Sequence, residues 1–202
     1  MSERIQARWM WICTALPAAW MVWQLLMGKL GPDPAEALMQ GTGEWVLRGL
    51  VLVLLAAPLA KQGYRLLFRH RRALGLAVFA YASLHLLLFC QVYIGWSGAI
   101  LLEELAERPY VVVGFSAWLL LLPLAVTSTD RARRAMGRQW RRLHRLIYPA
   151  VILGWLHLLW LSRSDRGQAL VYALILGILL FWRLWRDRKD LLQRLRVESP
   201  QR

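Results

Sequence analysis

Long apolar runs, each near the length of a membrane-spanning helix, alternate along the chain with short polar stretches. A helix needs roughly 20 residues to cross a bilayer, whereas a barrel strand needs only about 10. The pattern therefore predicts an all-α integral membrane protein, in which each helix satisfies its own backbone hydrogen bonds. The predicted spans, which make up a single transmembrane domain over residues 1–202, are residues 9–27, 45–60, 73–94, 109–128, 143–161 and 168–185.

The segments between and before the spans add three expectations. Residues 28–44 form the longest outer loop, and the stretch AEALMQ at 35–40 is a candidate short interfacial helix. Pro58 marks the end of the second span or a kink in it, because proline removes a helical hydrogen bond. The first run exceeds the ~7–15 apolar residues of a cleavable signal and no A-x-A site follows it, so we expect a retained first span.

Composition supports a membrane class and limits the partners. Hydrophobic residues make up 58% of the 202 residues, against about 45–50% in soluble domains. Several of the 12 tryptophans fall near the ends of apolar runs, where membrane proteins place aromatic belts. The net charge of +14 sits in clusters between apolar runs, which favours a lipid bilayer and excludes nucleic acid. Cys13 and Cys90 lie in apolar segments outside any CxxC motif, so no disulfide framework is expected.

The distribution of Lys and Arg predicts the orientation. The N-terminus, residues 61–72, residues 128–145 and the tail from residue 183 hold 21 of the 26 basic residues. Cytoplasmic loops carry such an excess, so both termini of the six-helix bundle are expected in the cytoplasm. The loops contain neither a catalytic domain nor a Gly-rich nucleotide motif. Any chemistry must therefore belong to a bound cofactor or to a separate protein.

The four histidines fall at two depths. With a helical rise of ~1.5 Å per residue, His85 lies roughly 20 Å along the third span and His157 roughly 22 Å along the fifth. Both of these spans start on the cytoplasmic side, so the two histidines reach a similar level in the outer leaflet. His144 lies at the inner end of the fifth span, and His70 precedes the third span at comparable height.

Histidines at matched depths predict haem ligation. An ionisable residue within a span is a functional-site hypothesis by default, and imidazole is the usual axial ligand of haem iron. We predict one or two b-type haems, with His85 and His157 as the outer pair of metal ligands. His144 is the ligand at the inner level, and His70 is a candidate for its partner. The alternatives are a hydrogen bond to a neighbouring backbone for a buried histidine, an interfacial cation for His144 and a solvated loop residue for His70.

Two further features bear on this hypothesis. Residues 13 apart are about 140° out of phase on an ideal helix, so His144 and His157 share one groove only if the helix is broken, and Pro149 is the candidate break. Arginines are natural partners of haem propionates. Arg72 is the candidate at the inner level, where positive-inside anchoring is the other interpretation. Arg48 is the candidate at the outer level, where a quinone headgroup and snorkelling to the interface are the other interpretations.

Several stretches carry a resemblance to a known family. They are LRGLVLVLLAAPL at 47–59, RRALGLAVFAYASLH at 71–85, RPYVVVG at 108–114, LAVTSTD at 124–130 and WRRLHRLIY at 140–148, with His157 downstream. Over about residues 43–186 the chain resembles the MsrQ/YedZ family, haem-binding membrane subunits of the bacterial periplasmic protein-methionine-sulfoxide reductase system. That family is part of the ferric-reductase-like transmembrane group.

The resemblance implies a multi-pass protein of the bacterial inner membrane that carries electrons through b-type haem. Such subunits take electrons from a cytoplasmic flavin reductase or from membrane quinol and pass them to a periplasmic molybdopterin-dependent methionine-sulfoxide reductase. FMN is also associated with the family. The family's histidines correspond to His85, His144 and His157, whereas His70 falls outside its pattern.

Two alternatives remain open from the sequence. One is a ferric- or quinone-reductase-type transmembrane cytochrome with another acceptor. The other is a non-redox transporter or scaffold, in which the histidines would serve as proton relays or packing contacts. Haem content separates the second alternative from the first, since a transporter would lack a Soret band.

Overall fold

The computed structural model describes residues 3–162 and 166–198, which are helical wherever they are regular. Residues 163–165 of the predicted outer loop and the last four residues of the tail lie outside the described residues. The prediction of an all-α protein with six spans is confirmed. The helices long and apolar enough to cross a membrane are Arg8–Leu26, Pro34–Lys61, Arg71–Ile94, Pro109–Val126, Arg138–Leu161 and Gly167–Arg186.

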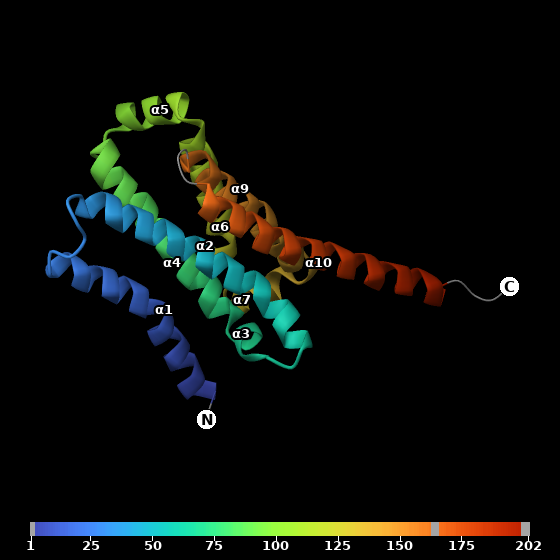
Figure 1. The fold of residues 1–202 in the computed structure, drawn as a ribbon. Helices are drawn as coiled ribbons and strands as arrows, with labels where there is room; N and C mark the ends of the chain where they lie inside the picture. The colour runs from blue at the N-terminus through green and yellow to red at the C-terminus, as the bar shows by residue number, and fades with distance from the viewer. Residues whose placement is uncertain (1–2, 163–165, 199–202) are drawn as a thin grey trace.

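The described elements follow one another as helices with short connections (Figure 1). In chain order they are α1 (Glu3–Leu26), α2 (Pro34–Lys61), α3 (Leu66–Arg69), α4 (Arg71–Phe89), a π-helical turn (Cys90–Ile94), α5 (Gly98–Glu107), α6 (Pro109–Val126), α7 (Asp130–Met136), α8 (Arg138–Leu143), a 3₁₀ turn (His144–Leu146), α9 (Ile147–Leu161) and α10 (Gly167–Glu198). In Figure 1, α5 lies at one end of the bundle, and α3 and α7 lie at the opposite end.

Two helix pairs make the centre of the bundle: α2 packs along α4, and α6 packs along α9. Leu50 of α2 and Val151 of α9 are buried in the core, with 1% and 0% of their surfaces exposed. A side chain at Gly49 would place its Cβ 2.5 Å from the Cγ2 atom of Val78 on α4. The absence of a side chain there lets α2 and α4 approach each other closely, as small residues do between membrane helices.

The second span begins earlier than the sequence pattern predicts. The Asp33 carboxylate accepts a hydrogen bond from the Glu36 amide at 2.9 Å and Pro34 occupies the first turn, which together start the helix. Residues 35–40 are therefore the first turns of α2, and the prediction of a separate interfacial helix in a loop is wrong. At the other end α2 passes through Pro58 and ends at Lys61, so Pro58 does not terminate it.

The break in the fifth span lies just before Pro149. Residues 144–146 form a 3₁₀ turn between α8 and α9, and Pro149 is the third residue of α9. Proline has no N–H to offer the carbonyl of Arg145 four residues earlier, which favours a local departure from α-helical bonding upstream. A 3₁₀ turn winds more tightly than an α-helix. On an ideal helix His144 and His157 would point in different directions, and a break in the helix between them was predicted at Pro149. The break is present, but it lies about one turn nearer to His144.

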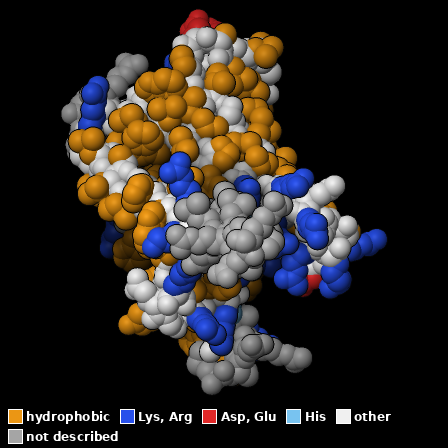
Figure 2. Space-filling model, turned by 90° about the vertical axis from the view of Figure 1, so that its right-hand side faces the viewer, with side chains coloured by type: hydrophobic (Ala, Val, Ile, Leu, Met, Phe, Trp, Pro, Cys, Tyr) orange, Lys and Arg blue, Asp and Glu red, His pale blue; other side chains and the backbone are white. Residues whose placement is uncertain are grey.

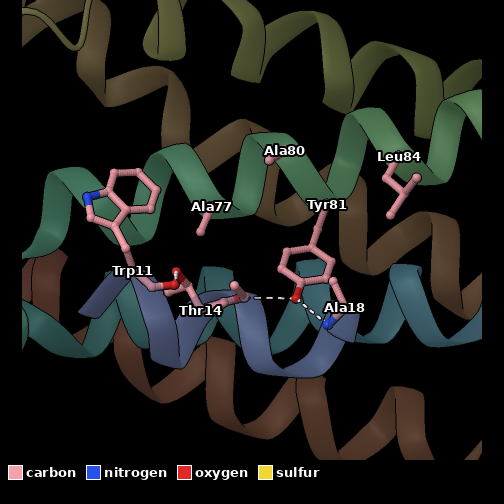
Figure 3. Close-up of a pocket in the computed structure, with 8 residues that line it drawn as sticks. Trp11, Thr14, Ala18, Ala77, Ala80, Tyr81 and Leu84 are labelled. Atoms are coloured by element: carbon pink, nitrogen blue, oxygen red, sulfur yellow. Dashed lines mark hydrogen bonds between the residues drawn. The ribbon is translucent and has the colours of Figure 1, made fainter. Parts of the chain in front are cut away.

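A tyrosine of α4 inserts into the backbone hydrogen-bond ladder of α1 and so joins α1 to the bundle (Figure 3). The Tyr81 hydroxyl of α4 donates to the Thr14 carbonyl and accepts from the Ala18 amide, both at 2.9 Å. These two backbone groups are four residues apart and would otherwise bond to each other. Pro17, next to Ala18, already interrupts the ladder. Tyr81 borders an apolar cleft of about 230 Å³ between α1 and α4.

Charge and hydrophobicity separate along the bundle. Figure 2 shows mainly hydrophobic side chains over the upper part of one face, whereas most of the Lys and Arg side chains seen on it lie in the middle and lower parts. The separation agrees with a bilayer around the upper band and a basic side below it. Cys13 and Cys90 are both free thiols, as the sequence predicts.

Candidate functional site

The structure brings His85 and His157 together from two different helices. His85 belongs to α4 and His157 to α9, and their ring centroids are 6.2 Å apart. The ring planes make an angle of 86°, so one imidazole stands nearly perpendicular to the other. Both side chains are half-buried. The sequence predicted this pair from matched depths alone.

The ring of His85 is held by the first turns of α2. Its Nδ1 atom lies 3.0 Å from the Met39 carbonyl oxygen and 3.2 Å from the Thr42 hydroxyl oxygen. The Thr42 side chain is almost fully buried, with 1% exposed, and its hydroxyl lies 2.9 Å from the carbonyl of Leu38, to which it donates. A carbonyl oxygen only accepts, so Nδ1 carries the proton. The other ring nitrogen, Nε2, is then the nitrogen with a free lone pair.

The ring of His157 is held in the same manner by α6. Its Nδ1 atom donates to the carbonyl oxygen of Tyr110 at 2.7 Å, which leaves Nε2 as the unprotonated nitrogen. The Tyr110 hydroxyl accepts a hydrogen bond from Arg108 at 3.1 Å. That bond raises the pKa of the Arg108 guanidinium, with Glu104 adding a further attraction. Arg108 therefore stays charged at the N-terminal end of α6.

A glycine lies beside each imidazole. A Cβ built on Gly43 would lie 3.2 Å from Cε1 of His85, and one built on Gly114 would lie 2.7 Å from Nδ1 of His157. Gly43 lies four residues after Met39 in α2, whose carbonyl binds the His85 ring. Gly114 lies four residues after Tyr110 in α6, whose carbonyl binds the His157 ring. We call this arrangement of a backbone carbonyl with a glycine one turn later a carbonyl–glycine notch. Each histidine thus sits in one notch on the neighbouring helix.

The geometry of the pair fits two axial ligands of one haem. Two imidazoles on opposite sides of a metal, each with a metal–nitrogen bond of about 2 Å, would have centroids roughly 6.3 Å apart, close to the 6.2 Å found here. Both rings carry their protons on Nδ1 and bind backbone carbonyls, the usual support of a ligating histidine. No cluster of three or more His, Cys, Asp or Glu occurs within the described residues. A pair of imidazoles would suit an iron whose other ligands come from a porphyrin.

His144 is bound differently. Its Nε2 atom lies 3.1 Å from the Thr127 hydroxyl oxygen, and its ring stacks on Trp140 at a centroid distance of 3.9 Å. The Thr127 hydroxyl donates to the Pro123 carbonyl at 2.6 Å, so it accepts a hydrogen bond from His144. In this arrangement Nε2 carries the proton, the reverse of the outer pair. The role of His144 as a ligand stays a prediction, and it requires ligation through Nδ1 or release of the Thr127 contact.

His70 occupies the N-cap position of α4. Its Nε2 atom is buried and finds no hydrogen-bond partner within the described residues. Across the same part of the chain, neither a hydrogen bond nor a ring contact joins His70 to His144. The predicted pairing at the inner level therefore remains a prediction. At the outer level the rings of His85 and His157 do lie close together, and their role as ligands also remains a prediction.

The two candidate arginines are engaged in ion pairs. Arg48 pairs with Glu44 one turn earlier and lies over the Trp45 ring. Arg72 pairs with Asp130 at 3.3 Å, which links the start of α4 to the start of α7. Both side chains are exposed. Their roles as propionate partners stay predictions, and each would require the arginine to share or leave its carboxylate.

Sequence reasoning missed the residues that orient the two histidines. They are Met39, Thr42 and Gly43 in α2, with Tyr110 and Gly114 in α6. Residues 39–43 were assigned to a loop, although Asp33-Pro34 with Glu36 is a helix-start signal that would have included them. Backbone carbonyls leave no trace in side-chain patterns. The glycines were visible in the sequence, but only a neighbouring helix reveals what they face.

Comparisons with known proteins give the family of the chain. Residues 42–155 match the family described as the ferric reductase like transmembrane component. A protein of Xanthomonas euvesicatoria pv. vesicatoria (strain 85-10) is 45% identical over 168 residues, covering 83% of this chain and 77% of the relative. One of Xanthomonas oryzae pv. oryzae (strain MAFF 311018) is 42% identical over 182 residues, covering 90% and 84%. One of Polaromonas naphthalenivorans (strain CJ2) is 41% identical over 174 residues, covering 84% and 80%.

All three relatives carry the name protein-methionine-sulfoxide reductase heme-binding subunit MsrQ. The family match begins at Thr42 and ends two residues before His157, so it spans most of the elements that build the site. More than half of the chain is matched by the family, and the relatives cover more than four fifths of it. The chain therefore belongs to the MsrQ family of haem-binding subunits, within the ferric-reductase-like transmembrane group.

Proposed function

We propose that this chain is a b-type haem subunit that carries electrons across a bacterial inner membrane, and that His85 and His157 are the axial ligands of one haem. The observation that carries the proposal is the pair of imidazoles 6.2 Å apart, each with Nδ1 bound to a backbone carbonyl. A bound haem would supply a one-electron carrier in the outer half of the bilayer. The relatives' names, which specify haem binding, support the haem but do not bear on which residues hold it.

In this proposal the protein contributes orientation and a fixed protonation state. The Met39 and Tyr110 carbonyls hold the protons on Nδ1, so each Nε2 keeps its lone pair directed away from the supporting helix. Because carbonyls of helical residues move little, their hydrogen bonds hold the two rings in place. The ligand site is thereby preorganised, which lowers the cost of binding.

The proposed direction of electron flow is from the cytoplasm outward. We propose both termini in the cytoplasm, supported by the excess of basic residues on that side. The donor is a cytoplasmic flavin reductase or membrane quinol, and FMN is a further candidate cofactor. The acceptor is a periplasmic molybdopterin-dependent methionine-sulfoxide reductase, supported by the name of the relatives. His144 remains the proposed ligand of a second, inner haem, with His70 the candidate for its partner.

A transmembrane ferric or quinone reductase is the second candidate function. The match to the ferric-reductase-like component favours it as much as the first, because that match concerns the haem-carrying bundle and not the acceptor. Both candidates require haem between His85 and His157. They differ only in what receives the electron.

The experiment uses the full chain purified in detergent with added haem precursor during expression. Pyridine haemochrome analysis and the Soret band measure haem, and we expect at least one haem per chain. Protein without haem would end both candidates. The reduced protein is then mixed with a purified periplasmic methionine-sulfoxide reductase or with a ferric chelate. Rapid reoxidation by the reductase alone is the result we expect, whereas reoxidation by the chelate alone would establish the second candidate.

A further inference from the structure

We propose that Gly43 and Gly114 are positioning residues that set the mutual orientation of the two haem-ligating imidazoles. The inference rests on the proposed function, since it concerns the same pair of histidines. Neither glycine touches the iron. Because each glycine lacks a side chain, the edge of the histidine ring can lie directly against the helix backbone at that position.

The two notches repeat one construction on two helix pairs. In α2 the Met39 carbonyl binds His85, and in α6 the Tyr110 carbonyl binds His157. The glycine one turn further along each helix lies against the same ring. A ring held by its Nδ1 atom at one point and by the helix surface at another can neither slide nor rotate freely.

Both imidazole rings lie close to their glycines, and the His157 ring lies closer to Gly114 than the His85 ring does to Gly43. A Cβ at Gly114 would meet three ring atoms of His157 at 2.7, 2.8 and 3.2 Å. A Cβ at Gly43 would meet Cε1 and Nδ1 of His85 at 3.2 and 3.4 Å. Ordinary van der Waals contact begins at 3.4 Å. An added methyl group must therefore displace the His157 ring by more than it displaces the His85 ring.

Two helical glycines of the described part of the chain, Gly75 and Gly154, do not have this relation to a ring. A Cβ at Gly75 in α4 would meet nothing within 4 Å, and one at Gly154 in α9 would meet only leucine methyl groups at 3.8 Å. Gly75 and Gly154 lie on the two helices that carry the histidines. They therefore serve as controls, in which the same methyl group is added to a helix that carries a histidine without reaching an imidazole.

The orientation that the notches impose has a spectroscopic consequence. The imidazole planes stand at 86° to each other. Perpendicular rings donate electron density to two different d orbitals of a low-spin ferric iron, which makes those orbitals nearly equal in energy. Near-equal orbitals give an electron paramagnetic resonance spectrum with one large, isolated g value. Rings closer to parallel separate the orbitals and give a rhombic spectrum.

The test compares the full-length variants Gly114→Ala, Gly43→Ala, Gly154→Ala and Gly75→Ala. Haem content, haem loss to apomyoglobin and the low-temperature spectrum of the ferric protein are measured for each. We expect Gly114→Ala to weaken haem retention by roughly 10–100-fold, as loss of a ligand's supporting contact does. Gly43→Ala should keep its haem but shift the large g value. The two controls should match the wild-type protein in all three measurements.

The outcomes separate this inference from the function on which it rests. A wild-type protein without haem refutes the proposed function. A haem-loaded wild type whose Gly114→Ala and Gly43→Ala variants match the controls refutes the positioning role and leaves the function intact. If Gly114→Ala does not accumulate, the milder Gly43→Ala variant decides the question through its spectrum.

Discussion

Replacing Tyr81 by Phe removes a single oxygen atom from the contact between α1 and the rest of the bundle. That oxygen bridges the Thr14 carbonyl and the Ala18 amide, each at 2.9 Å (Figure 3). Tyr81 is 8% exposed and packs between α1 and α4. The phenyl ring would remain in place, so the variant isolates the hydrogen bonds from the packing.

The size of the effect follows from the two backbone groups that lose their partner. A polar group left unsatisfied in apolar surroundings costs about 1–3 kcal/mol, so two groups cost about 2–6 kcal/mol. Helix α1 has little else to hold it, because Met21 is its single fully buried side chain among the described ones. The loss therefore falls on the docking of α1. At the lower limit, local opening becomes about 30-fold more frequent, since 1.4 kcal/mol corresponds to a factor of ten.

Hydrogen exchange at the Ala18 amide is the direct assay. Mass spectrometry of peptides from α1 would compare the purified wild type with Tyr81→Phe under identical detergent conditions. Exchange in α1 should accelerate by at least about 30-fold, while exchange in α6 and α9 should be unchanged. Tyr64→Phe is the control, because Tyr64 is 70% exposed and loses its hydroxyl in water.

Unchanged exchange in α1 would refute the reasoning. It would mean that the Ala18 amide and the Thr14 carbonyl close directly onto each other once the hydroxyl is gone. The interrupted ladder at Pro17 would then be a local bend that does not need Tyr81.

Two further variants test other contacts. Thr42→Val removes one hydrogen-bond acceptor from Nδ1 of His85 and should raise the haem midpoint potential by roughly 20–65 mV, which is ~0.5–1.5 kcal/mol for one electron. Thr42→Ser keeps the hydroxyl and should have the wild-type potential. An unchanged potential in Thr42→Val would show that the Met39 carbonyl alone polarises the ring. Gly49→Ala places a methyl group 2.5 Å from Val78 and should destabilise the α2–α4 packing by about 1–3 kcal/mol. The measurement is the Tm of the purified protein in detergent, which should fall. A higher Tm would contradict the close packing of α2 on α4.

The spans could be predicted because each is an apolar run of the right length, and the bilayer imposes that length. The start of α2 could not be predicted from hydropathy, since residues 34–44 contain two glycines, two glutamates and a glutamine. Those glycines are tolerated inside the helix because they face Met21 and His85. The prediction failed where a helix extends beyond its apolar stretch to support a site.

The histidines show the same division. Matched depths were enough to predict that His85 and His157 meet, because helical rise is constant. Depth alone did not give the tautomers or the ring planes, which depend on backbone carbonyls of α2 and α6. At the inner level the depth argument gave a pairing of His144 with His70. In the structure His144 contacts Thr127 and Trp140 instead. The spacing of residues along the sequence does not predict side-chain contacts of this kind.

Haem content of the single and double histidine variants tests the central claim most directly. The purified proteins are His85→Ala, His157→Ala and the double variant, each analysed by pyridine haemochrome against the wild type. Because the two rings serve one iron in this account, each single variant should lose the same amount of haem, and the double variant should lose no more than either. Wild-type haem content in either single variant, or additive losses in the double variant, would contradict the account.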